Sequence, residues 1–294
     1  FREIDAETRS WLYPIYPFKT QEDQQQFIDH FHPVNLLSRH PKARPLISAT
    51  ELASLQSMVQ RYIQAMKLSP DIIIQEGVMC AWMKQNADDP KSEDPKGVEM
   101  VPAIAYCNYL DGKIINVKFR SVQQDPITGE WSKGFLQISP TKPCAPYGIE
   151  SINDLRPDAE IIHQIIITEG EKDRLTLMSC GYPYVLSVAN GAGTNIAESH
   201  EAFEEWILQA EEIVICGDGD RPGRMLVKAL ADRYQTRAKV ASLPCGKKDI
   251  SEVYEAFGCN EVRRIIEEAK PVNEGDVYDP VSYTHLRAHE TRRH

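Results

Sequence analysis

Two groups of acidic residues directly follow apolar segments and could bind a metal ion. The group EGEKD (169–173) comes after the apolar run 165–168, and the group DGD (218–220) comes after the run 213–217. Open parallel sheets bind ligands beyond the carboxyl ends of their strands. Carboxylates at that edge suit Mg²⁺, which takes oxygen ligands and is often held together with substrate phosphates. The two groups therefore predict a metal-dependent enzyme that acts on phosphates.

The spacing inside each group is compatible with a shared site. Glu169 and Asp173 are four residues apart, so they lie on one face once a helix has begun. Asp218 and Asp220 are two residues apart, which places both carboxylates on one side of an extended segment. Taken singly, each group could equally be an exposed turn or a helix cap, because Asp and Gly are common turn residues. One strand–helix unit separates the groups, so a parallel sheet would bring them together, and this favours the metal site.

Glycine and proline residues accompany the acids. Gly170 allows the backbone to approach a ligand closely, and Gly223 relaxes the turn after the second group. Pro222 suits the first turn of a helix, whose free amide groups favour a bound anion. We expect Gly170 and Gly223 to support the site rather than to react.

The elements around the acids alternate between strand and helix from residue 161 onward. Such alternation with short connections indicates an α/β domain with a mostly parallel sheet flanked by helices. Strands are expected at 161–168, 184–188, 212–216 and 238–243, and helices at 172–180, 198–209, 222–234, 251–257 and 261–269.

A smaller α+β region is expected before this domain. Strands at 101–109 and 113–122 are joined by Asp111-Gly112, a hairpin signal, and a third strand follows at 134–138. Earlier, a capping box at Ser48 predicts a helix to about residue 66, and Ser69-Pro70 begins a second, shorter helix. Positive charge concentrates in the strand region, either as a nucleic-acid contact or as a solvated strand face: Lys113, Lys118, Arg120, Lys133 and Lys142.

We therefore divide the chain into four parts. These are a mainly helical region (1–75), a basic α+β subdomain (76–160), the parallel α/β domain (161–272) and a tail (273–294) that is non-native or disordered. The tail segment 281–291 resembles translated sequencing-adapter read-through, so its two histidines, although spaced like a metal pair, are excluded from functional reasoning.

Composition limits the class of protein. The hydrophobic fraction of 42% and the charged fraction of 26% are ordinary for a globular protein, and the formal charge of −10 argues against a wholly basic nucleic-acid binder. No apolar run is long enough to cross a bilayer, so we expect a cytoplasmic protein with no membrane partner. The chain begins at Phe1, as expected of a fragment. The seven cysteines form no Cys-x-x-Cys pair, which argues against a zinc ribbon and for reduced thiols.

The acidic groups resemble the motifs of the TOPRIM fold found in primases, topoisomerases and related nucleases. The segments TEGEKDRLTLMSCGYPYV (168–185) and LPCGKKDISEVY (243–254) resemble the primase half of phage and Twinkle-type primase–helicases. The segment DGDRPGR (218–224) is also similar to bacterial DnaG-type primases. Upstream, AIAYCNYLDGKIINVKFRS (103–121) resembles the basic segment that precedes TOPRIM in these proteins, and APYGIESI (145–152) resembles the link into it. The resemblance covers roughly residues 68–272.

The resemblance implies roles for residues at matching positions. Glu169, Asp218 and Asp220 would be catalytic and, with Asp249, would hold Mg²⁺ or Mn²⁺, while Asp173 would support the site from its helix. Nucleic acid or nucleotide would be bound by Lys118, Arg120, Asn190, Gly191 and Lys248. Asn190 and Gly191 belong to the loop 187–193, which could equally be an ordinary Asn-Gly turn.

The implied activity is synthesis of short RNA primers on a single-stranded DNA template by nucleotidyl transfer from ribonucleoside triphosphates, with a replicative helicase in cis or in trans. The zinc-binding module and the phosphate-binding helicase loop that accompany such primases have no counterpart in this sequence. Two alternatives stay open: a TOPRIM nuclease or topoisomerase-like enzyme, and a DNA-binding TOPRIM module that does not prime.

Overall fold

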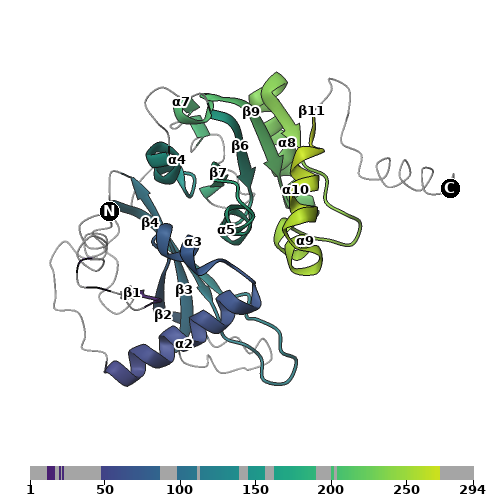
Figure 1. The fold of residues 1–294 in the computed structure, drawn as a ribbon. Helices are drawn as coiled ribbons and strands as arrows, with labels where there is room; N and C mark the ends of the chain where they lie inside the picture. Colours follow the sequence, from purple (N-terminus) through teal and green to yellow (C-terminus); the bar gives the residue numbers. More distant parts are fainter. Residues whose placement is uncertain are drawn as a thin grey trace.

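The computed structural model shows two sheets with helices around and between them (Figure 1). It describes residues 12–16, 20, 22, 48–86, 98–110, 113–138, 145–155, 162–189, 200–201 and 204–271. Among these residues, no helix is long and apolar enough to cross a bilayer. The tail, Asp111-Gly112 and Lys142 lie outside them.

The first sheet is antiparallel, and its strands follow their order in the chain. They are β1 (Tyr13–Pro14), β2 (Met79–Asn86), β3 (Val98–Leu110), β4 (Lys113–Ser121) and β5 (Phe135–Ile138). Helices α2 (Ala49–Ala65) and α3 (Pro70–Gln75) accompany this sheet. The predicted capping box is confirmed, since the backbone N–H of Glu51 donates to Ser48 Oγ (3.2 Å) and that of Ser48 donates to Glu51 Oε2 (2.9 Å).

The second sheet is mostly parallel, as predicted. Its order is β11 (Lys270–Pro271), β10 (Ala238–Val240), β9 (Ala210–Cys216), β6 (Ile162–Thr168) and β7 (Val185–Ser187). Every neighbouring pair is parallel except β10 with β11. The strand expected at 238–243 ends at Val240, although Ala241 still donates its N–H to the Ile215 carbonyl at 3.0 Å.

Helices cover both faces of this parallel sheet. Helices α5 (Glu171–Ser179), α9 (Ile250–Phe257) and α10 (Cys259–Glu267) pack on the face that carries Ile166 and Val214. The opposite face, with Ile165 and Ile213, packs against α4 (Ile149–Leu155), α7 (Glu204–Ile207) and α8 (Arg221–Tyr234). Neighbouring strand residues point to opposite faces, so a sheet buried on both sides needs apolar residues at every position. This requirement explains the continuous apolar runs in the sequence.

Helix α5 lies between the two sheets (Figure 1). One apolar core contains residues of β2 and β3, of helices α2, α3 and α5, and of β6 and β9, so the antiparallel and parallel sheets share buried surface. Almost all side chains of α5 are buried, including three that carry charge: Glu171, Asp173 and Arg174. Charged groups at such positions are stable only when they are paired or hydrogen-bonded. Their partners, described below, come from three different elements.

The prediction of reduced thiols is wrong for one pair of cysteines. Cys180, after α5, and Cys259, at the start of α10, form a disulfide with their Cα atoms 5.2 Å apart. Their separation of 79 residues gave no sequence signal, because only the packing of α10 beside α5 brings them together. Among the described residues the free cysteines are Cys80, Cys107 and Cys216, which are buried, and Cys245, which is exposed.

Candidate metal centre and nucleic-acid interface

Three carboxylates meet at the carboxyl edge of the parallel sheet. Strands β6 and β9 are neighbours; Glu169 follows β6, and Asp218 and Asp220 follow β9. One ligand oxygen from each of the three residues lies within 4.8 Å of the others. In the sheet, β7 lies on one side of β6, and the next strand along the chain, β9, lies on the other side. The carboxylates therefore lie between β6 and β9, where the strand order reverses. This is the position at which open α/β sheets bind ligands.

The turn after β9 is held by contacts with the following helix. Asp220 caps α8, accepting a hydrogen bond at Oδ1 from the Gly223 N–H at 3.0 Å. A side chain at position 223 would collide with the Asp218 carbonyl oxygen. We expected Gly223 to relax the turn, but φ is not positive there, so its role is to permit a close approach. Nη1 of Arg224 donates to the Gly219 carbonyl at 2.6 Å and closes the turn.

Lys248 brings a positive charge to the carboxylates. Its Nζ lies 3.2 Å from Asp218 Oδ2 and 3.7 Å from Asp220 Oδ2, and its carbonyl accepts the Gly219 N–H at 2.7 Å. Burial raises the pKa of Asp218, opposed by Lys248 and reinforced by Asp249 and Asp220. Burial alone would lower the pKa of Lys248, but the carboxylates together raise it. A cation therefore already balances the acids where a metal would bind.

Asp249 has a different place from the one expected. Its Oδ1 accepts the Glu252 N–H at 2.7 Å, which makes it the N-cap of α9. Within the described part of the chain, the group of converging carboxylates contains Glu169, Asp218 and Asp220 but not Asp249. Asp249 still acts through its charge, because it raises the pKa of Asp218. The structure thus assigns it a capping contact, and its expected role as a fourth ligand is not supported by this geometry.

Asp173 is buried and links α5 to α9. Its Oδ1 accepts hydrogen bonds from the Ser251 hydroxyl (2.5 Å) and the Ser251 N–H (3.2 Å). Burial, together with the charge of Asp249, raises the pKa of Asp173 to about 7. A side chain at Gly170 would come within 2.9 Å of the Asp173 carboxylate. Asp173 therefore holds the start of α9 beside the turn that carries Glu169.

The other two buried charges of α5, Glu171 and Arg174, pair with the antiparallel region. Glu171 Oε2 accepts a hydrogen bond from Lys118 Nζ at 2.8 Å, and Arg174 Nη1 lies 2.7 Å from Glu76 Oε2. Lys118, predicted to contact nucleic acid, is therefore engaged by Glu171, with 23% of its side chain exposed. Sequence reasoning missed both pairs, because partners 53 or more residues apart leave no local pattern.

The second predicted cation, Arg120, lies beside an exposed aromatic ring. In the β4–β5 register Arg120 faces Phe135 and Lys118 faces Gln137, which places the four side chains on one face of the sheet. Phe135 is 68% exposed, and Gln137 Nε2 donates to the Ala189 carbonyl at 2.9 Å, next to the end of β7. We missed Phe135 and Gln137, although strand alternation with the two cations could have revealed them. Asn190 and Gly191 lie outside the described residues.

The chemistry of the three acids fits a hard divalent cation. All donors are carboxylate oxygens, as Mg²⁺ and Mn²⁺ prefer, and sulfur is absent from the group. Glu169, Asp218 and Asp220 would hold such an ion, whose identity the donor set does not distinguish.

Comparison with known proteins agrees with this geometry. Residues 163–243, which contain β6 to β10 and all three carboxylates, match the model of the Toprim domain family. The chain carries a Toprim domain. Its relatives include the primase homolog protein of Arabidopsis thaliana, 29% identical over an alignment of 187 positions that covers 57% of this chain and 50% of that protein. Another is the chloroplastic/mitochondrial Twinkle homolog protein of Arabidopsis thaliana, 24% identical over an alignment of 244 positions that covers 76% of this chain and 30% of that protein.

A solved structure has a similar fold. The primase fragment of the bacteriophage T7 primase–helicase protein superposes with a TM-score of 0.51 at 25% identity, over 69% of this chain and 72% of that one. The Toprim fold and the primase relationship predicted from the sequence are therefore confirmed. The chain spans about half the length of the Arabidopsis primase homologue and less than a third of the Twinkle homologue.

Proposed function

We propose that this chain is the catalytic core of a primase that joins ribonucleotides on a single-stranded DNA template, as part of a primase–helicase. The observation that carries the proposal is the convergence of Glu169, Asp218 and Asp220 at the switch point of the Toprim sheet. The primase relatives support the reaction, and the Twinkle and T7 relatives support a helicase partner in cis or in trans.

Phosphoryl transfer depends on positioning and on neutralising charge more than on covalent chemistry. A bound Mg²⁺ or Mn²⁺ would supply Lewis-acid stabilisation of phosphate oxygens. The carboxylates of Glu169, Asp218 and Asp220 would hold that ion, and Asp220 is already fixed by its cap on α8. The Lys248 ammonium, 55% exposed on its side chain, would exchange its contacts with the aspartates for a nucleotide phosphate.

The antiparallel sheet would supply the template or nucleotide contacts. Arg120 and Phe135 share one face of β4 and β5, so a phosphate on the guanidinium and a base on the ring fit one nucleotide strand. Lys118 would add a charge while remaining bound to Glu171, because an ammonium has three donors. Because Gln137 contacts the backbone of Ala189, this face is continuous with the carboxyl edge of β7.

Primer synthesis is the direct test. The chain, with its native flanking sequence restored, is given ribonucleoside triphosphates, Mg²⁺ and a single-stranded template, and the short RNA products are resolved on a gel. Glu169→Gln should abolish the products, since removing a metal-binding or acid–base group costs at least about 10²-fold. Glu130→Gln, an exposed acid in the β4–β5 connection, is the matched control and should retain synthesis.

The same assay distinguishes the alternatives. Strand cleavage without primers would replace the proposal with a Toprim nuclease. Template binding with neither activity would replace it with a module that does not prime.

A further inference from the structure

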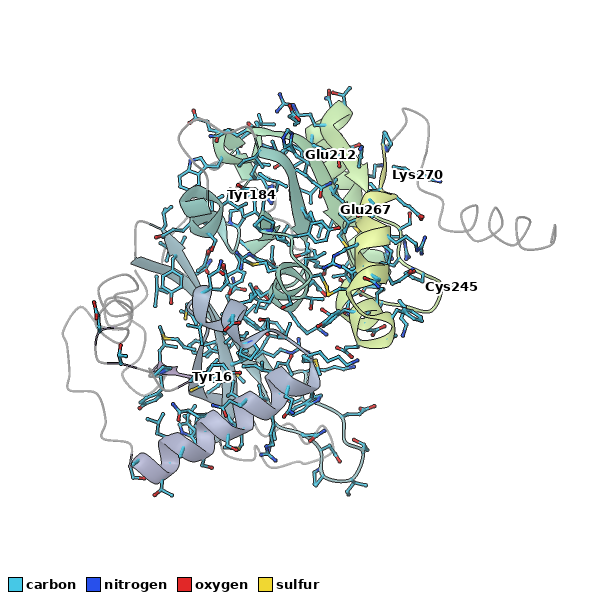
Figure 2. All side chains as sticks on the ribbon, viewed as in Figure 1. Tyr16, Tyr184, Glu212, Cys245, Glu267 and Lys270 are labelled. Carbon is cyan, nitrogen blue, oxygen red and sulfur yellow. A yellow bond between two sulfur atoms is a disulfide. The ribbon has the colours of Figure 1, made fainter. Side chains whose placement is uncertain are left out.

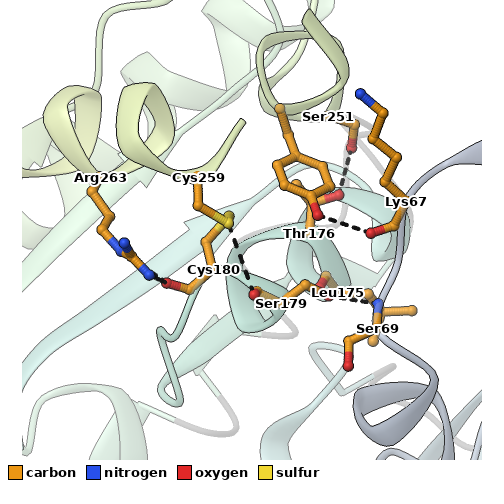
Figure 3. Close-up of a disulfide and its surroundings, with 10 residues drawn as sticks. Lys67, Ser69, Leu175, Thr176, Ser179, Cys180, Ser251, Cys259 and Arg263 are labelled. Carbon is orange, nitrogen blue, oxygen red and sulfur yellow. Dashed lines mark hydrogen bonds between the residues drawn. A yellow bond between two sulfur atoms is a disulfide. The ribbon is translucent and has the colours of Figure 1, made fainter. Parts of the chain in front are cut away.

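A disulfide joins the end of α5, a helix that begins beside the proposed metal centre, to the start of α10. Cys180 follows the last residue of α5, Cys259 is the first residue of α10, and their Cα separation of 5.2 Å is within the normal range for the bond (Figure 3). Helix α5 follows Glu169 in the chain, and α9, which precedes α10, begins directly after Lys248 and Asp249. The bond therefore connects the two segments that carry opposite sides of the site.

We propose that Cys180 and Cys259 form a reversible disulfide whose oxidation fixes α9 and α10 against α5. In the oxidised state the loop of Lys248 and Asp249 is held close to the carboxylates, and in the reduced state it moves more freely. The consequence for metal or nucleotide binding rests on the proposed function, whereas the change in helix stability does not.

The surroundings of Cys259 favour exchange. This cysteine is only partly buried, and it occupies the first turn of α10, where free amide groups stabilise a thiolate. Arg263, one turn later, donates from Nε (3.2 Å) and Nη2 (3.0 Å) to the Cys180 carbonyl, so a guanidinium lies next to the pair. A stabilised thiolate makes a disulfide easier to reduce.

The reduced pair keeps non-covalent contacts. Sγ of Cys259 lies 3.9 Å from the Ser179 carbonyl oxygen, so the thiol formed on reduction can donate to that oxygen. The bonds from Arg263 to the Cys180 carbonyl do not depend on the sulfur atoms. Reduction should therefore loosen the junction of α5 and α10 without unfolding the domain.

The exchange reaction is balanced by a dithiol reductant. Its thiolate attacks Sγ of the partly exposed Cys259 and forms a mixed disulfide; the bond to Cys180 breaks, and the Cys180 sulfur leaves with the electron pair and takes a proton. The second thiolate of the reductant then displaces Cys259 as a thiolate. Two electrons pass to the protein, and the reductant becomes a cyclic disulfide. Oxidation by a small disulfide reverses these steps.

Nearer the site, α5 and α9 are joined without a covalent bond, by hydrogen bonds, by the ion pair between Lys172 Nζ and Glu255 Oε1 (3.6 Å) and by apolar packing. Asp173 Oδ1 accepts from the N–H and hydroxyl of Ser251, and the hydroxyls of Thr176 and Ser251 are 3.1 Å apart. Ser251 lies two residues after Asp249, so this end fixes the site loop directly. When the disulfide opens, these hydrogen bonds still restrain the start of α9, together with the Lys172–Glu255 ion pair and the apolar packing of α9 on α5. Motion of α9 should then reach Lys248.

Hydrogen exchange of the air-oxidised and dithiothreitol-reduced chain tests the proposal. Reduction in native buffer should speed amide exchange in α9 and α10 about 10-fold or more and lower the Tm by roughly 5–10 °C, as expected for opening a 79-residue loop. Alkylation with a maleimide polymer counts the thiols in each state. Cys259→Ser should remove the response, and Cys245→Ser, at an exposed position between β10 and α9, should keep it (Figure 2).

Any of three results would overturn the proposal. The two cysteines could remain unpaired in oxidised glutathione, or their disulfide could be reduced only in denaturant. Amide hydrogen exchange in α9 and α10 could also be equally fast in the oxidised and reduced states. Mn²⁺ titration separates this from the proposed function. If Mn²⁺ binds neither the oxidised nor the reduced protein, the metal centre is rejected. If Mn²⁺ binds both with the same affinity, only the effect of the disulfide on the site is rejected.

Discussion

Arg174 and Glu76 form an ion pair with Nη1 and Oε2 2.7 Å apart, and both side chains are buried. Arg174 also donates from Nε to the Val185 carbonyl at 2.7 Å and lies 5.0 Å from the centroid of the Tyr147 ring. Glu76 in turn accepts a hydrogen bond from the Ser151 hydroxyl at 2.7 Å. One guanidinium on α5 thus contacts the end of α3, the strand β7 and the link into the Toprim domain.

Removing one member of this pair should be strongly destabilising. Arg174→Met leaves the Glu76 carboxylate buried without its cation, which typically costs about 3–5 kcal/mol. Nη2 of Arg174 and Oε1 of Glu76 make no hydrogen bond to a described residue, so the pair is incompletely satisfied. The double variant Arg174→Met with Glu76→Leu should therefore lose less than the sum of the single losses. Urea unfolding measures all three.

The exposed pair Arg264–Glu268 on α10 is the matched control. Its side chains are 41% and 57% exposed, so Glu268→Ala should change the free energy of unfolding by at most about 0.5 kcal/mol. If the Arg174→Met and Glu268→Ala variants lose the same free energy of unfolding, the buried ion pair does not stabilise the contact between α5 and α3.

Asp218→Asn with Asp220→Asn should weaken Mn²⁺ binding at least about 10-fold in calorimetric titration, because two carboxylate ligands lose their charge. Asn at 220 can still accept the Gly223 N–H, so α8 keeps its cap. Asp249→Asn also preserves a cap and should weaken binding less, since Asp249 lies outside the carboxylate group. Unchanged affinity in the double variant would remove the metal centre.

Lys248→Met should act in the opposite direction. The ammonium contacts both aspartates, so its removal leaves more negative charge for a metal and should tighten Mn²⁺ binding. Weaker metal binding in this variant would mean that Lys248 shapes the site rather than competing with the ion.

Gly223→Ala should disturb the site through the backbone. The new methyl group would collide with the Asp218 carbonyl, so the turn or the start of α8 must move, at a cost of roughly 1–3 kcal/mol. Mn²⁺ affinity should fall together with stability. Gly246→Ala is the control: φ is +81° there but no atom lies near, so stability alone should fall. Calorimetry and thermal melting measure the two quantities.

The Toprim sheet was predictable from the sequence because its information is local. The apolar runs 165–167 and 213–216 are continuous since helices cover both faces, and acids just after them identify the ligand edge. Helix α5 shows the limit of this reasoning. Its charges look like a solvated face, yet Glu171, Asp173 and Arg174 are buried. Their partners come from β4, α9 and the end of α3, which no local pattern reveals.

His200 should make the protein sensitive to acid. Burial, with a smaller effect of Arg233, lowers the pKa of His200 to about 4, and its Nδ1 is 2.6 Å from the Tyr234 hydroxyl. The folded state thus binds this proton less readily than the unfolded chain, whose histidine pKa is about 6.5. Stability is present above pH 6.5 and falls as the pH drops toward 4, by about 2 kcal/mol at pH 5.

Urea unfolding at pH 7 and pH 5 measures this contribution. His200→Gln should reduce the difference between the two pH values by about that amount, since glutamine does not titrate. An identical pH dependence in the variant would assign the acid sensitivity to other groups.

Arg120 should contribute to binding of single-stranded DNA. The guanidinium shares a strand face with exposed Phe135, and its buried Nε makes no hydrogen bond to a described residue. Each phosphate contact on a single strand contributes about 0.7 to the slope of log K against log salt. Arg120→Ala should therefore weaken binding to an oligonucleotide and lower that slope by about 0.7. Fluorescence anisotropy across a salt series gives both values.

A charge-matched control separates contact from net charge. Lys270→Ala removes one positive charge on β11, at the edge of the Toprim sheet (Figure 2), and should leave the slope unchanged. Lys118→Ala should have a smaller effect than Arg120→Ala, because Glu171 already neutralises that ammonium. If Lys270→Ala and Arg120→Ala lower the slope equally, the effect is one of overall charge, and the β4–β5 face is not the nucleic-acid contact.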